Sequence, residues 1–169
     1  MAATVTTEMI ESEIERLRDT KLDREDANQV VRELGEIIGI EDLQLDEEGV
    51  AELIIDGQVE LSLVHLPELP GIIAAAALPE GMEADPAVLR QILATNLSWQ
   101  ATQGGCFTFV EPRLAICRLI PLGPGQSELL DQELARFVHR ARAWQEMLGQ
   151  EEVAEASDDS GNEDVGVRV

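Results

Sequence analysis

The side chains of this 169-residue chain that could carry out catalysis are not spaced so as to assemble a site. His65 and His139 have no cysteine or paired carboxylate at ligand spacing, so both are interpreted as structural residues. Ser127 has no neighbouring base and is interpreted as a helix cap. Carboxylates are abundant, but no pattern selects two of them as a general acid and a general base. The sequence therefore predicts no catalytic residue and a protein that is not an enzyme.

Loops that could bind phosphate or a metal ion also lack the residues that this chemistry needs. Gly104 and Gly105 lead into a predicted strand, and no lysine follows them as in a phosphate-binding loop. The loop at residues 123–125 precedes a helix, where an anion can bind, but it has no lysine nearby in a strongly acidic chain. Residues 46–48 lack the alternating oxygen ligands of a calcium loop. We therefore expect no metal site and no cofactor.

The two cysteines, Cys106 and Cys117, lie in apolar surroundings. A free cysteine behaves as a small apolar residue and is usually buried in a protein core. The positions therefore predict buried free thiols on neighbouring strands, rather than a disulfide or a metal site.

The chain carries 34 acidic and 12 basic residues, a formal net charge of −22. So much negative charge repels nucleic acid phosphates and anionic lipids, which argues against nucleic acid and membrane partners. Residues 1–20 do not resemble a signal peptide, and the most apolar run, residues 69–78, is too short to span a bilayer. We expect a cytoplasmic protein whose acidity maintains solubility, prevents self-association of an apolar surface or attracts a basic partner.

The hydrophobic periodicity predicts an α+β fold. Helices are expected over residues 23–38, 85–97 and 127–149. Strands are expected over residues 50–56, 59–64, 71–78, 106–110 and 114–120. Asp56 and Gly57 have the composition of a two-residue hairpin turn. The order helix, strands, helix, strands, helix predicts an antiparallel twisted sheet with three main helices on one face.

The composition divides the chain into three regions. Residues 1–22 form a polar extension whose narrow apolar stripe predicts a helix that forms on contact with another surface. Residues 23–149 form the single α+β domain. Residues 150–169 are rich in Asp and Glu with Ser, Gly and Asn between them, which predicts a disordered acidic tail.

Several segments, taken in order, carry a resemblance to a known family. Its main elements are residues 34–40 (Leu-Gly-Glu-Ile-Ile-Gly-Ile), 45–51, 53–56, 93–96 (Leu-Ala-Thr-Asn), 105–109 and 114–117, and Trp144 lies near the end of the last helix. In this order and at this spacing they resemble the Tir chaperone-like family, the type III secretion chaperones that bind effector proteins. The resemblance covers about residues 26–148, and the sequence departs from the family pattern before and after them.

The resemblance implies a homodimer that binds secreted effector proteins in the bacterial cytoplasm. Such a chaperone keeps the N-terminal region of an effector partly unfolded and secretion-competent. It then promotes delivery to the secretion apparatus and its ATPase. It hydrolyses nothing itself.

Two sets of apolar residues are predicted to make these contacts. An extended client can pair with a sheet edge while its alternate side chains enter apolar pockets. Ile54 and Val64 are the better candidates for client contacts, because in the alternation along their strands they face the side opposite to their apolar neighbours. The client-binding candidates are Leu34, Ile37, Ile38, Leu43, Leu45, Leu53, Ile54, Ile55, Leu61, Leu63 and Val64. Plain core packing is the alternative for each of them. The dimer-interface candidates are Leu89, Ile92, Leu93, Leu97 and Trp99.

Two other functions remain open at the level of sequence. A regulator of the secretion system could use the same fold to sequester a transcription factor or an apparatus component, with the acidic tail docking a basic partner. Loss of partner binding on truncation after Gln150 would favour that alternative. A small enzyme is supported only by the plentiful carboxylates.

Overall fold

A five-stranded antiparallel sheet forms the centre of the protein. The computed structural model describes residues 21–81, 85–110 and 113–158, and for Trp99 and residues 149–158 it describes the backbone alone. The strands are β1 (Val50–Ile55), β2 (Val59–His65), β3 (Gly71–Ala77), β4 (Cys106–Val110) and β5 (Arg113–Pro121). Their order is β1-β2-β3-β5-β4, so β1 and β4 are the two edges. The predicted α+β fold with an antiparallel sheet is confirmed.

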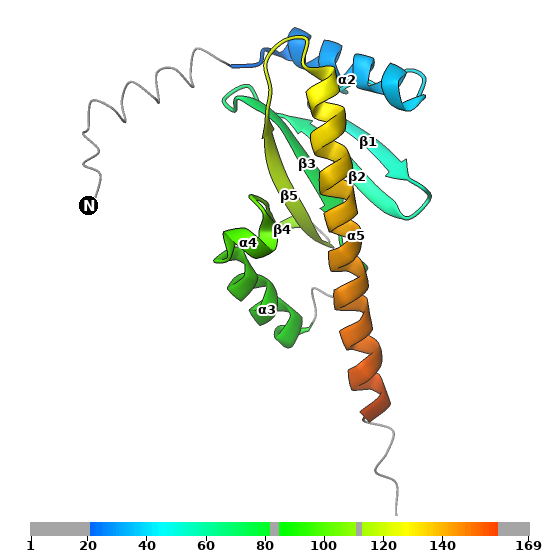
Figure 1. Cartoon of the computed structure of the whole chain (residues 1–169), viewed down its shortest axis with the longest axis vertical. Coiled ribbons are helices and arrows are strands. Elements are labelled where there is room, and N and C mark those ends of the chain that lie inside the picture. Colours follow the sequence, from blue (N-terminus) through cyan, green and yellow to red (C-terminus); the bar gives the residue numbers. More distant parts are fainter. Residues whose placement is uncertain (1–20, 82–84, 111–112, 159–169) are drawn as a thin grey trace, which may run out of the picture.

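Four described helices accompany the sheet. The long helix α5 (Ser127–Asp158) runs across one face of it, and α2 (Arg24–Ile38) packs against α5 (Figure 1). α3 (Pro86–Asn96) and the short α4 (Trp99–Thr102) lie together beside β4, away from α2 (Figure 1). No helix within the described ranges is long and apolar enough to cross a membrane.

Local polar contacts determine where α2 and its neighbouring hairpin begin and end. The Asp23 carboxylate accepts a hydrogen bond from the Asp26 N–H at 2.8 Å, which caps α2. Gly39 ends this helix in the left-handed conformation, with φ 76°. Asp56 and Gly57 both have positive φ, 51° and 67°, and they are the central residues of a turn closed by the hydrogen bond from the Gln58 N–H to the Ile55 carbonyl at 3.0 Å. Because the register pairs Ile55 with Val59, the connection between β1 and β2 is three residues long, one more than predicted.

The start of α5 differs from the prediction for Ser127. The first helical hydrogen bond runs from the Leu130 N–H to the Gln126 carbonyl at 3.0 Å, so Gln126 occupies the capping position. Ser127 is buried inside the first turn, and its side chain forms a hydrogen bond with Glu33 of α2. The predicted capping role of Ser127 is therefore wrong, because this hydroxyl joins two helices instead.

The core lies between the sheet and the helices. Leu53, Leu61, Ala76, Ile116 and Phe107 lie side by side in register across all five strands and are buried. Burial of each large apolar side chain contributes about 1.5–3 kcal/mol. Helix α5 supplies the opposing layer, and its buried residues include Leu130, Leu134, Phe137, Ala141 and Leu148.

The end of α5 lies further along the chain than predicted. The helix was expected to end near Gly149, but it continues to Asp158. Residues 151–156 are glutamate, alanine and valine, and five of these six are favourable or neutral in helices, so the acidic composition did not end the helix. The predicted boundary of the helix therefore differs from the observed one, whereas the disorder predicted from residue 150 stays a prediction. Residues 1–20 and 159–169 lie outside the described residues, and the division into extension, domain and tail stays a prediction.

Candidate functional site

Edge strand β1 presents unpaired backbone groups along its outer side. The Val50 N–H donates to Asp46 Oδ1 at 2.9 Å, and the Val50 carbonyl accepts from the Asp46 N–H at 2.8 Å. The backbone groups of Val50 therefore point away from β2. Because this direction alternates along a strand, those of Glu52 and Ile54 also point outward. No described strand lies on that side, so β1 is open to an incoming strand.

An apolar groove lies next to this open edge. It has a volume of about 450 Å³ and is built from three elements, the end of α2, strand β1 and the middle of α5. Ile38 and Ile40 line one wall, Ile55 lies at the strand, and Leu134 and Val138 line the helical wall. A strand paired with β1 would direct every second side chain toward the helical side of the sheet, where this groove lies.

Arg142 of α5 lines the groove. Its Nη2 atom forms an ion pair with Asp56 in the β1–β2 turn. Its Nε atom is buried and has no hydrogen-bond partner among the described residues, which is a costly arrangement for a donor.

The structure separates the predicted client-binding residues by accessibility. Six of them are core residues with at most 7% exposure, namely Leu34, Leu43, Leu45, Leu53, Leu61 and Leu63. Ile38, Ile55 and Val64 are half-buried, whereas Ile37 is 47% and Ile54 65% exposed. The six leucines are therefore not accessible to a client in this structure. The parity argument for Ile54 agrees with its exposure.

Several groove residues were missed from the sequence. Leu134 and Val138 belonged to the predicted apolar stripe of the last helix, which did not distinguish groove from core. Ile40 follows the α2 cap, where no periodicity remains. Arg142 and His139 also line the groove, and no sequence signal could have placed them beside β1.

The face of the sheet opposite α5 carries a second hollow. It has a volume of about 680 Å³ and is lined by strand residues, among them Ser62, Ala75, Ala77 and Ala115. These small side chains lie beside larger neighbours on the same face, Glu52 and Ile54 of β1. The hollow is partly open to solvent.

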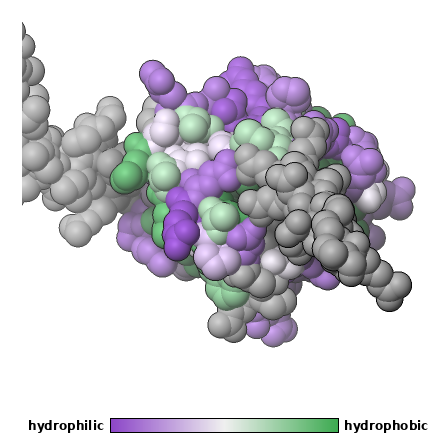
Figure 2. All heavy atoms as spheres, turned by 90° about the horizontal axis from the view of Figure 1, so that it is seen from below, coloured by the Kyte–Doolittle hydropathy of each residue, from purple (hydrophilic) through white to green (hydrophobic). Residues whose placement is uncertain are grey.

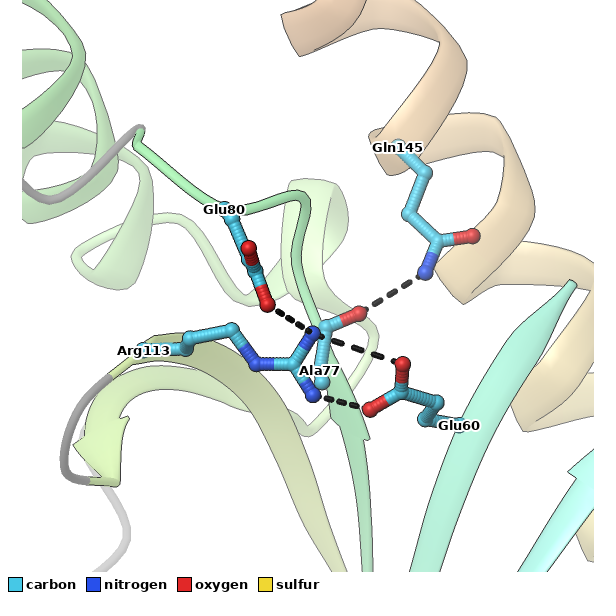
Figure 3. A network of polar contacts seen from close by, with 5 residues as sticks. All are labelled: Glu60, Ala77, Glu80, Arg113 and Gln145. Carbon is cyan, nitrogen blue, oxygen red and sulfur yellow. Dashed lines mark hydrogen bonds and ion pairs between the residues drawn. The ribbon is translucent and has the colours of Figure 1, made fainter.

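A polar network joins three strands and α5 at the end of this face. Arg113 of β5 forms an ion pair with Glu60 of β2 and lies 3.8 Å from Glu80 (Figure 3). The Gln145 amide of α5 donates to the Ala77 carbonyl at 2.8 Å (Figure 3). The hydrogen bond from Arg113 lowers the pKa of the Glu60 carboxyl below its ordinary value. These charges are already paired with one another, so we interpret the network as structural.

The other edge of the sheet, β4, is bound by α3 at Phe107. The Asn96 side chain donates from Nδ2 to the Phe107 carbonyl at 3.1 Å and accepts from the Phe107 N–H at 2.7 Å. One amide thereby occupies the outward backbone groups of Phe107 and leaves Phe109 as the other outward-facing residue of β4. The two edges of the sheet are therefore not equivalent, because β1 keeps two outward-facing residues, Glu52 and Ile54, next to the apolar groove.

Helix α3 carries the predicted dimer-interface residues on two of its sides. Ile92 is 4% exposed and belongs to the core, and Leu89 packs against the core. Leu93 and Leu97 are 67% and 92% exposed. Figure 2 shows isolated hydrophobic patches among the hydrophilic surface at this lower end of the molecule. The side chain of Trp99 lies outside the described residues.

The histidines and cysteines are only partly as predicted. His65 is buried, and its Nε2 lies 2.8 Å from the Leu22 carbonyl, which agrees with a structural role. Cys106 and Cys117 are free thiols on neighbouring strands, as predicted. The prediction that both are buried is wrong, because Cys106 is exposed on the edge strand and Cys117 is half-buried.

Comparisons with known proteins agree with this fold. The model of the Tir chaperone protein (CesT) family matches residues 29–145. A chain in the crystal structure of the ExsC–ExsE complex is 27% identical, with a TM-score of 0.65 over 75% of this chain and 96% of that one. A chain in the structure of the HopA1–SchA chaperone–effector complex is 18% identical, with a TM-score of 0.58 over 74% of this chain and 98% of that one. No curated protein sequence matches the chain.

The family match covers more than half of the chain, so the protein belongs to the Tir chaperone protein (CesT) family. This is a family of cytoplasmic type III secretion chaperones that bind effectors and have no enzymatic activity. The resemblance seen in the sequence is confirmed.

Proposed function

We propose that this protein is a homodimeric chaperone that holds the N-terminal region of a secreted effector in an extended, secretion-competent form. It then promotes delivery of the effector to the secretion apparatus and its ATPase. The open outer side of β1 next to the apolar groove is the observation that supports this function most directly. An extended segment bound there would be ordered by backbone hydrogen bonds without folding into a globular unit.

The client segment would lie antiparallel or parallel to β1 and bond to the outward N–H and C=O groups of Glu52 and Ile54. Its apolar side chains on one side would enter the groove between α2 and α5. Its side chains on the other side would lie next to the exposed side chains of Glu52 and Ile54. This arrangement favours a client that alternates apolar residues with basic ones.

Dimerisation would use the exposed side of α3. Leu93 and Leu97 are large apolar residues one turn apart that no described residue covers well. An isolated pair of this kind on a strongly acidic surface is suited to burial against the same pair of a second copy. Since α3 lies at the end of the sheet opposite β1, each protomer would keep its open edge accessible.

The experiment is co-expression with a candidate effector, beginning with secreted proteins encoded beside this gene. The informative variant is Ile54→Pro, because the Ile54 N–H points away from β2 and its loss leaves the β1–β2 ladder intact. We expect an effector to co-purify with the wild type, and Ile54→Pro to weaken its binding by at least about tenfold, since backbone pairing and edge conformation are both affected.

Two controls separate this result from a general loss of fold. Ile54→Val keeps the N–H and a β-branched apolar side chain, and should bind nearly as the wild type does. Phe109→Pro places the same change at an outward-facing position of β4, the other edge, and should also leave binding unchanged. If Ile54→Pro binds the effector as well as Ile54→Val while both are folded, the client does not pair with β1.

A further inference from the structure

Cys106 and Cys117 form a pair of directly opposed thiols on the last hairpin. They are register partners across β4 and β5, and their Sγ atoms lie 3.4 Å apart. Since Asn96 binds the outward backbone groups of Phe107, the neighbouring Cys106 must direct its own toward β5. Opposed residues of this kind have Cα atoms about 5.5 Å apart, within the range most common for disulfides. A modest rotation of both side chains would bring the sulfurs to bonding distance.

The two thiols differ in how accessible they are. Cys106 is exposed on the edge strand, where a dissolved oxidant can reach it. Cys117 is half-buried, and this burial, with a smaller contribution from the nearby Cys106, raises the pKa of its thiol to about 12. Cys117 is therefore protonated at neutral pH. Because the thiolate is the nucleophile in thiol oxidation, the first attack falls to Cys106.

We propose that Cys106 and Cys117 are a redox-active dithiol, which a peroxide converts into an intrachain disulfide that fastens edge strand β4 to β5. The Cys106 thiolate attacks the peroxide, the O–O bond breaks, and Cys106 becomes a sulfenic acid while one water is released. The Cys117 sulfur then attacks the sulfenic sulfur, and its proton leaves with the departing hydroxyl as a second water. Two thiols are oxidised by two electrons, and the peroxide is reduced to two waters. A cellular dithiol reductant restores both thiols by exchange and is itself oxidised to a disulfide.

The location of this pair determines what its oxidation would change. Among the described strands, β5 is the only one that pairs with β4. Helix α3 is in turn attached to β4 through the Asn96 amide. A bond between Cys106 and Cys117 would restrain β4 directly and α3 through it. Disulfides in cytosolic proteins are mostly transient and redox-sensing, which suits an exposed pair like this one.

The test treats the reduced full-length chain with hydrogen peroxide and analyses it by mass spectrometry and by amide hydrogen exchange. We expect a product lighter by two hydrogens, a peptide that joins Cys106 to Cys117 within one chain, and full reversal by dithiothreitol. Amide exchange in β4 and α3 should be several-fold slower in the oxidised form. Absence of the intrachain link, or a link that leaves exchange in β4 and α3 unchanged, would overturn the proposal.

Single variants test the order of the two steps. Cys117→Ser should accumulate a sulfenic acid at Cys106, which a cyclic diketone probe traps. Cys106→Ser should react much more slowly, because its remaining thiol is half-buried and protonated. Equal trapping at Cys117 in Cys106→Ser would overturn the assignment of Cys106 as the attacking sulfur.

Discussion

The side-chain amide of Asn96 forms two hydrogen bonds with the backbone of Phe107, one through its nitrogen at 3.1 Å and one through its oxygen at 2.7 Å. Asn96 is the last residue of α3, and Phe107 is the second residue of β4. The contact occupies the outward backbone groups of one residue of this edge strand and attaches α3 to it at the same point.

Replacement of Asn96 with alanine should therefore destabilise the protein. The change leaves a part-buried N–H and C=O without partners, and we expect a loss of about 1–3 kcal/mol in the free energy of unfolding. Asn96→Asp keeps the acceptor but not the donor and should lie between alanine and the wild type. Urea denaturation measures both, and an alanine variant as stable as the wild type would show that water replaces the amide without cost.

Gly35 should not tolerate even the smallest side chain. A Cβ atom there would lie 2.8 Å from the Ile40 carbonyl oxygen and 2.8 Å from Leu43 Cβ, and neither atom can move independently of the backbone. Gly35→Ala should cost about 1–3 kcal/mol by overpacking, although alanine is the better helix former. The neighbouring Glu36→Ala, on the exposed side of α2, should be close to neutral. Thermal unfolding of the two variants, compared directly, tests the contact.

Leu93→Asp and Leu97→Asp should convert a dimer into a folded monomer. Both leucines are exposed on α3, so a charge there costs little within one chain but would be buried between two. Light scattering gives the mass, and circular dichroism checks the fold. The same change at Leu129, a partly exposed leucine of α5, is the matched control and should leave the mass unaltered. Persistence of the dimer in both α3 variants would exclude α3 as the interface.

Charge reversal at Glu52 should weaken the binding of a client with basic residues. Glu52 is exposed on β1, where it would be a direct cross-strand neighbour of the client, and such pairs contribute about 0.2–1 kcal/mol. We expect Glu52→Lys to lower affinity several-fold at low salt and less at high salt, because screening reduces the interaction. Glu146→Lys, on the exposed side of α5, makes the same change in net charge away from β1. Equal effects of the two variants would indicate general electrostatics rather than contact at β1.

The sequence predicted the elements of this fold well because each has a local signal. Helices α2 and α3 lie close to the predicted ranges 23–38 and 85–97, and Asp56 and Gly57 lie in the turn after β1 as predicted. The caps Asp23, Gly39 and Asp85 and this turn all act on neighbouring backbone groups, which is why local composition indicates such elements. The end of α5 was missed because acidic residues were interpreted as a sign of disorder, although glutamate and alanine favour helices.

The candidate site was much harder to predict, because it depends on which strands become edges. Alternation shows that Leu53 and Ile54 face opposite sides of β1, but it does not show that β1 has no outer neighbour. Strand β3 pairs with β5 and not with β4, the next strand along the chain, and this pairing leaves β1 and β4 at the edges. Which strands become edges therefore depends on the pairing of the whole sheet. Asn96 contacts Phe107 and Arg142 contacts Asp56, but nothing in the sequence indicates that the two residues of either pair come together.

The packing of α5 on the sheet also imposes an order on folding during synthesis. All five strands precede Ser127, so the hairpins can form on the ribosome before the helix that covers them has been made. Until then Leu61, Leu63 and Ile116 face water on one side of a nascent sheet. Ribosome pausing or termination before α5 would leave an intermediate with an uncovered apolar face, so translation of the last quarter of the message becomes the step that protects this chaperone from its own aggregation.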